Sequence, residues 1–169
     1  MGLSVFTLIH ILISLAGILA GLVVAGGWVS GKQHGGLAAF FLVTTAATSV
    51  TGFFFPFRGF TPAYAVGILS MVVLIVAAFA LYNGKLSGSW RKVYVINALI
   101  ALYLNFFVLV AQIFQKTPAL KELAPTQSEP PFAIAQSLVL LAFISLGIAA
   151  VRGFKTAATS RSGGYSPLS

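Results

Sequence analysis

Five long apolar segments dominate this chain of 169 residues and decide what it can fold into. Each segment provides the roughly 20 residues that a helix needs to span a membrane. Turn-forming stretches separate them, "SGKQHGG", "RGFTP" and "NGKLSGS", followed by one long connection, "QKTPALKELAPTQSEPP". We therefore expect an all-helical transmembrane bundle with five spans, at about residues 3–29, 37–57, 61–82, 91–114 and 132–151.

The composition is that of a membrane protein rather than a soluble domain. Only 7% of the residues are charged and 59% are hydrophobic, whereas about a quarter of the residues of a soluble domain are charged. The ten Lys and Arg give a net charge of +8, but they are scattered between the apolar segments and form no basic face. We expect the lipid bilayer as partner, another membrane protein or a second copy of the chain as further candidates, and no nucleic acid.

The distribution of Lys and Arg predicts the orientation of the chain, because positively charged loops stay in the cytoplasm. One side has Lys32, Lys85, Arg91, Lys92, Arg152, Lys155 and Arg161, and the other has Arg58, Lys116 and Lys121. We expect the N-terminus outside, a periplasmic loop at residues 115–131 and the C-terminus in the cytoplasm. Residues 1–155 form the predicted transmembrane domain, in which the short connection 58–61 makes an antiparallel hairpin, and residues 156–169 form a flexible cytoplasmic tail.

The predicted external loop contains both acidic residues of the chain, Glu122 and Glu129. It also contains several prolines, and the two consecutive prolines at its end fit the first turn of the fifth helix, where a missing N–H costs nothing. One interpretation is a stiff, solvated connector. The other is a cap over a cavity, with Gln127, Ser128 and Glu129 facing inward.

The fourth segment is predicted to carry a polar stripe. Its members fall within about 80° of arc on a helix: Tyr94, Asn97, Asn105, Gln112 and Gln115. Asn105 lies near the midplane, where an unpaired amide costs several kcal/mol, so the stripe must face protein, water or a ligand. It is explained either by hydrogen bonds between helices or by a binding site. The second segment offers a partner surface in Thr44, Thr48 and Thr51, unless these hydroxyls bond back to their own helix.

His10 is the only ionisable side chain predicted well inside a span, which makes it a functional candidate. Counted inward from the external face, Gln112 and Gln136 lie at a similar depth and Asn105 lies deeper. We therefore predict a ligand-binding site beneath the loop, formed by His10, Asn105, Gln112, Gln136, Glu129 and Gln127. The alternative is a neutral His10 that is hydrogen-bonded to a neighbouring helix.

Patterns of catalysis and metal binding are missing from the sequence. It has no Cys or Asp, no paired carboxylates within the spans and no P-loop, HExxH or GxSxG motif, so we expect neither an enzyme nor a metal site. His10 and His34 are predicted on opposite sides of the membrane and cannot ligate one haem together. The leading hypothesis is a non-enzymatic membrane protein that binds a small or lipid-like molecule, or an accessory subunit of a membrane complex, with no cofactor implied. The alternatives are an oligomeric small-solute transporter or channel, and a quinone- or haem-linked redox protein.

Residues 112–136, which contain "FQKTPALKELAPTQSEPPF", resemble uncharacterised small multi-pass inner-membrane proteins of Gram-negative bacteria. The likeness extends to "TTAATSVTGFFFP" in the second segment and "ALYLN" in the fourth. The resemblance implies a location in a bacterial inner membrane and no particular activity.

Overall fold

Six helices make up the part of the chain that the computed structural model describes, residues 4–56, 59 and 61–162, and these residues form no strand. Five of the helices are long and apolar enough to cross a membrane: α1 (Val5–Val29), α2 (Gly35–Phe53), α3 (Pro62–Tyr82), α4 (Trp90–Lys116) and α6 (Pro130–Ser162). The remaining helix, α5 (Pro118–Leu123), is short and lies between α4 and α6. The predicted all-helical fold with five helices suited to a membrane is confirmed.

Four of the six helices, α1, α3, α5 and α6, begin where the sequence satisfies or removes a free N–H group of the first turn. Ser4 begins α1, because its Oγ accepts the backbone N–H of Thr7 at 3.1 Å. Helices α3, α5 and α6 each begin with a proline, which has no N–H to satisfy and a backbone angle that fits a helix. These local signals explain why most of the predicted boundaries lie close to the observed ones.

Two elements differ from the prediction. Residues 115–131 were expected to be a loop, but they include the six-residue helix α5, which is too short to produce a recognisable apolar period. In helix α6 the segment long and apolar enough to cross a membrane is Pro130–Phe154; the helix then continues to Ser162, so residues 156–162 of the predicted tail are helical. No glycine or proline interrupts residues 154–162. Residues 163–169 and Arg58 lie outside the described residues.

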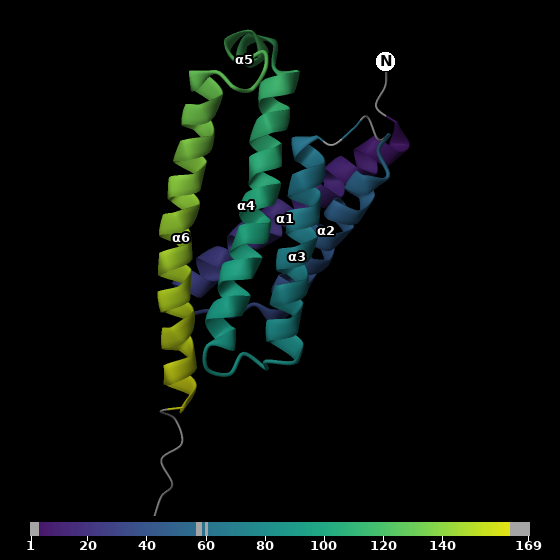
Figure 1. Ribbon diagram of the computed structural model, residues 1–169. Helices are drawn as coiled ribbons and strands as arrows, with labels where there is room; N and C mark the ends of the chain where they lie inside the picture. Colours follow the sequence, from purple (N-terminus) through teal and green to yellow (C-terminus); the bar gives the residue numbers. More distant parts are fainter. Residues whose placement is uncertain (1–3, 57–58, 60, 163–169) are drawn as a thin grey trace, which may run out of the picture.

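Helices α3, α4 and α6 run side by side, and α1 and α2 cross them obliquely (Figure 1). Within this arrangement α1 packs on α2, and α4 packs on both α3 and α6. The N-terminal end of α1 and helix α5 lie at one end of the bundle, the α5 end (Figure 1). The α3–α4 turn, residues 83–89, and the C-terminal end of α6 lie at the other, the turn end (Figure 1).

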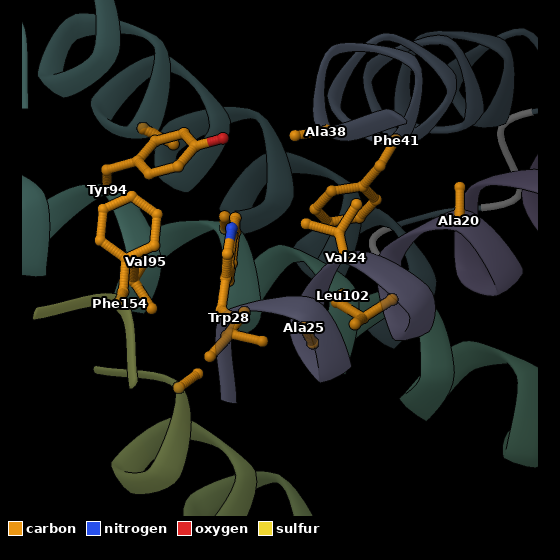
Figure 2. Close-up of a cluster of buried hydrophobic side chains, with 14 of the residues drawn as sticks. Ala20, Val24, Ala25, Trp28, Ala38, Phe41, Tyr94, Val95, Leu102 and Phe154 are labelled. Carbon is orange, nitrogen blue, oxygen red and sulfur yellow. The ribbon is translucent and has the colours of Figure 1, made fainter. Parts of the chain in front are cut away.

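The hydrophobic core is centred on the C-terminal half of α1. Figure 2 shows Val24, Ala25 and Trp28 of this helix beside Phe41 of α2, Leu102 of α4 and Phe154 of α6. The ring centroid of Trp28 is 5.5 Å from that of Tyr94 and 5.8 Å from that of Phe154. The core therefore joins α1, α4 and α6 towards the turn end.

Glycines allow the close helix contacts around this core. A Cβ atom at Gly21 of α1 would lie 2.6 Å from the side chain of Leu102 and 2.8 Å from that of Phe41. A Cβ atom at Gly153 of α6 would overlap the backbone carbonyl of Trp28. These glycines thus serve packing within the chain: Gly21 brings α1 close to α2 and α4, and Gly153 brings α6 close to α1.

Candidate functional site

Two side-chain amides at the α5 end attach the connecting segment and α6 to α4. Gln127 donates from Nε2 to the carbonyl of Ala111 at 2.7 Å, and Gln136 donates from Nε2 to the carbonyl of Phe107 at 3.0 Å. The two carbonyls are one helical turn apart, so both amides reach the same face of α4. The structure therefore brings together two of the predicted site residues, Gln127 and Gln136.

Glu129 bonds within its own loop. Its Oε1 accepts the backbone N–H of Thr126 at 3.1 Å and the hydroxyl of Thr126 at 2.8 Å, and its Oε2 accepts the N–H of Ser128 at 3.0 Å. Desolvation acts to raise the pKa of the Glu129 carboxyl, but the hydrogen bonds from Thr126 and Ser128 outweigh it and hold the pKa below its ordinary value of 4.5. Glu129 thus orders the loop at the start of α6, instead of facing inward as the cap interpretation required.

His10 is paired with α2. Its Nδ1 lies 2.7 Å from Oγ1 of Thr51, and its ring meets the ring of Phe55 edge-on with centroids 5.1 Å apart. The Thr51 hydroxyl uses its proton to bond the carbonyl of Ala47 at 2.7 Å, so the imidazole N–H is the donor to Thr51. The N-terminal end of α1 also lies apart from α6 (Figure 1). The structure therefore matches the alternative interpretation, in which His10 bonds a neighbouring helix, and it separates His10 from Gln136.

The two remaining amides of the predicted site point to different surroundings. Gln112 is exposed, whereas Asn105 is only 9% exposed and its Nδ2 has no hydrogen-bond partner among the described residues. Oε1 of Gln136 and Oγ1 of Thr45 also have no hydrogen-bond partner among the described residues, and Thr45, in α2, is completely buried. Buried polar atoms without partners cost about 1–3 kcal/mol each, so a polar partner at these atoms would stabilise the bundle.

The other residues of the predicted stripe bond mostly within their own helices. The hydroxyls of Thr44 and Thr48 donate to the carbonyls four residues earlier at 2.8 and 2.9 Å, and the amide of Asn97 does the same at 2.8 Å. Tyr94 is buried against the ring of Trp28. Of the three predicted threonines, only Thr51 also bonds another helix, through His10.

A groove beside the loop was not expected from the sequence. This α5-end groove has a volume of about 460 Å³ and is lined by Ser128, Pro130, Ala133, Ile134, Ser137 and Leu138. Its α6 residues recur at the spacing of one helix face, roughly 120° away from Gln136 and thus from α4. A lipid-facing helix surface also consists of small and apolar residues at this spacing, so the sequence pattern does not distinguish a binding groove from such a surface.

Among the described residues, no group of three or more His, Asp or Glu lies close enough together to hold a metal ion. Comparison of the chain with protein-family profiles, curated proteins and solved structures finds no match. The site is therefore interpreted from its own geometry, in which the loop, the first turns of α6 and the α4 carbonyls are the connected parts.

Proposed function

We propose that this chain is a non-enzymatic, multi-pass protein of a bacterial inner membrane that binds a lipid-like molecule in the α5-end groove. The proposal rests on the lining of that groove, which combines apolar walls with two hydroxyls at one end of a membrane-spanning helix. Ile134 and Leu138 offer contact for a hydrocarbon chain. Ser128 and Ser137 offer hydroxyls for a carbonyl or hydroxyl group of the same ligand.

Hydrogen bonds at the α5 end hold in place the loop and the first turns of α6, which line the groove. Gln127 holds the loop on α4, Gln136 holds α6 on α4, and Glu129 orders the loop between them. Both walls of the groove are therefore fixed before a ligand arrives, which lowers the entropy that binding costs. This arrangement favours binding over a loosely structured connector.

Binding is favoured over catalysis because the one acid–base pair that the sequence offers is separated. His10 bonds Thr51 of α2, whereas Glu129 bonds Thr126 and Ser128 of its own loop. A general acid and a general base must both reach the reacting group. The sequence resemblance supports a bacterial inner membrane, and the excess of Lys and Arg at the turn end supports a periplasmic location for the groove.

Photolabelling with a lipid tests the groove. The protein is reconstituted in phosphatidylethanolamine vesicles that contain a small fraction of phosphatidylethanolamine with a diazirine on one acyl chain. After irradiation, labelled peptides are mapped by mass spectrometry. We expect label to concentrate on residues 130–138 compared with the rest of the exposed face of α6.

Two matched substitutions decide whether the label reports the groove. Ala133→Trp fills it and should lower labelling of this segment by roughly a factor of three or more. Ala142→Trp changes an exposed alanine of the same helix outside the groove and should leave the labelling unchanged. Even labelling along α6 in the unmodified protein and in both variants would reject lipid binding at this groove.

A further inference from the structure

A second cavity lies at the turn end and is not part of the α5-end groove. This turn-end cavity has a volume of about 350 Å³ and is lined by Gly88, Ser89, Arg91, Lys92, Val95, Val151 and Phe154. The first two residues come from the α3–α4 turn, the next three from α4 and the last two from α6. The cavity therefore has a cationic side formed by Arg91 and Lys92 and an apolar side to which two helices contribute.

No acidic side chain of the protein can neutralise these two cations. The chain contains only two acids, Glu122 and Glu129, and both follow the far end of α4. Helix α4 has 27 residues and is therefore about 40 Å long. Charges act over about 8–10 Å at physiological ionic strength, so the carboxylates at the α5 end do not reach the cavity. A negative charge that complements Arg91 and Lys92 must therefore come from a group other than the carboxylates of Glu122 and Glu129.

Arg91 contacts the α3–α4 turn beside the cavity. Its Nε donates to the carbonyl of Leu86 at 3.4 Å, and no other hydrogen bond of this side chain occurs among the described residues, so its terminal amino groups can donate elsewhere. Leu86 and Gly88 have φ angles of 54° and 50°, which marks a sharply bent turn. Ser89 precedes α4 without capping it by a side-chain hydrogen bond, so its hydroxyl is also available to a ligand.

Aromatic residues place the turn end at the boundary between membrane and water. Tyr82 at the end of α3 is 71% exposed and Trp90 at the start of α4 is 39% exposed. Exposed Tyr and Trp at helix ends lie at the level of lipid headgroups in membrane proteins. The turn-end cavity shares this depth, because Ser89 and Arg91 flank Trp90 in the sequence.

We propose that the turn-end cavity binds a phosphate-bearing anion, with Arg91 and Lys92 as its charged ligands. The guanidinium of Arg91 can donate two hydrogen bonds to a phosphate, Lys92 adds a point charge, and the Ser89 hydroxyl adds a donor. The phosphate of an anionic phospholipid and a free phosphate share this chemistry. The apolar side of the cavity favours the phospholipid: Val151 is partly exposed and can contact an acyl chain, and the buried Val95 and Phe154 lie behind it.

Ligand-dependent stabilisation tests the proposal in the purified, full-length protein. Thermal unfolding in neutral detergent is followed while dioleoyl phosphatidylglycerol, dioleoyl phosphatidylcholine or inorganic phosphate is added at constant ionic strength. We expect phosphatidylglycerol to raise the Tm in a saturable manner and phosphatidylcholine to leave it unchanged. Saturation by inorganic phosphate alone, with the same dependence on Arg91 and Lys92, would support the phosphate site and assign a soluble anion to it.

Matched variants separate a specific site from general charge attraction. Arg91→Gln with Lys92→Gln should weaken phosphatidylglycerol binding about tenfold or more, whereas Lys116→Gln with Lys121→Gln removes two cations at the α5 end and should not. Val151→Trp fills the cavity without changing the charge and should also abolish the saturable shift. If the first variant does not fold, Lys92→Gln alone changes an exposed side chain and gives the same comparison. The proposal would be overturned if both double variants lost phosphatidylglycerol binding to the same extent. It would also be overturned if phosphatidylglycerol and phosphatidylcholine changed the Tm equally.

Discussion

A single carboxylate organises the loop before α6. The oxygens of Glu129 accept two hydrogen bonds from Thr126 and one from Ser128, all within a few residues of chain. An ionised carboxylate accepts hydrogen bonds more strongly than a protonated one. The order of this loop is therefore coupled to the charge of Glu129, and through Ser128 to the shape of the α5-end groove.

The coupling predicts how the loop responds to acid. The pKa of Glu129 in the folded protein lies below its ordinary value of 4.5, because the hydrogen bonds outweigh desolvation. The stabilisation by the ionised form is therefore fully present above pH 4.5 and is lost as the pH falls through the lower, folded pKa. In NMR spectra of the detergent-solubilised protein, we expect the amide resonances of Thr126 and Ser128 to titrate with a midpoint below 4.5.

Two variants provide the controls for this titration. Glu129→Gln keeps the size of the side chain but removes its charge, so the titration of both amides should disappear. Glu122→Gln removes the other acid, which is exposed in α5, and should leave the titration unchanged. A midpoint at or above 4.5, or a titration that persists in Glu129→Gln, would contradict the assigned role.

At the scale of elements, α6 packs on the C-terminal end of α1 through its backbone. A Cβ atom at Gly153 would overlap the carbonyl of Trp28 and lie 2.5 Å from the carbonyl of Val29. Backbone atoms cannot rotate away as side-chain ends can, so this contact requires glycine. The contact also seats Phe154 beside Trp28, with ring centroids 5.8 Å apart. One glycine thus supports both the core and the apolar side of the turn-end cavity.

Gly153→Ala should therefore destabilise the protein, although alanine alone favours a helix by about 1 kcal/mol. We expect overpacking to cost about 1–3 kcal/mol, measured as a lower Tm in detergent and as a shift in the denaturation midpoint. Gly26→Ala is the matched control in α1, because a Cβ atom there has no neighbour within 4 Å. This variant should be neutral or slightly stabilising. Equal stability of the two variants would show that α6 does not rest on α1 in this way.

The sequence predicts the spans well because length and hydropathy alone decide whether a helix can cross a membrane. It predicts the candidate site less well, because counting along a helix gives the depth of a residue but not its lateral neighbours. His10 and Gln136 were placed together by depth, yet the tilt of α1 directs His10 to Thr51 of α2. In the cap interpretation both Gln127 and Glu129 face inward; Gln127 bonds α4, whereas Glu129 bonds within its own loop. Arg91 and Lys92 entered the prediction only as charges that orient the chain.

At the scale of the whole molecule, the two ends of the bundle differ in chemistry. The α5 end has both carboxylates of the chain, together with Lys116 and Lys121. The turn end has no acidic side chain among the described residues and has most of the described Lys and Arg: Lys32, Lys85, Arg91, Lys92 and Arg152. Between the ends, large apolar side chains such as Leu19, Ile75 and Leu138 are more than half exposed, as a lipid-facing surface requires. The charges of the molecule are therefore distributed unequally between the two ends of the bundle.

This polarity predicts that the turn end faces the cytoplasm, since loops rich in Lys and Arg are retained there. Because the chain has no cysteine, one introduced thiol reports one position. Ala119 in α5 and Gln33 between α1 and α2 are exposed residues near opposite ends, and replacing either by Cys changes no charge. In spheroplasts of a Gram-negative host, a membrane-impermeant maleimide should label Ala119→Cys directly and Gln33→Cys only after lysis. Detergent-treated samples, in which both variants must react, control for accessibility, and the reverse pattern in intact spheroplasts would invert the orientation and place the turn-end cavity in the outer leaflet.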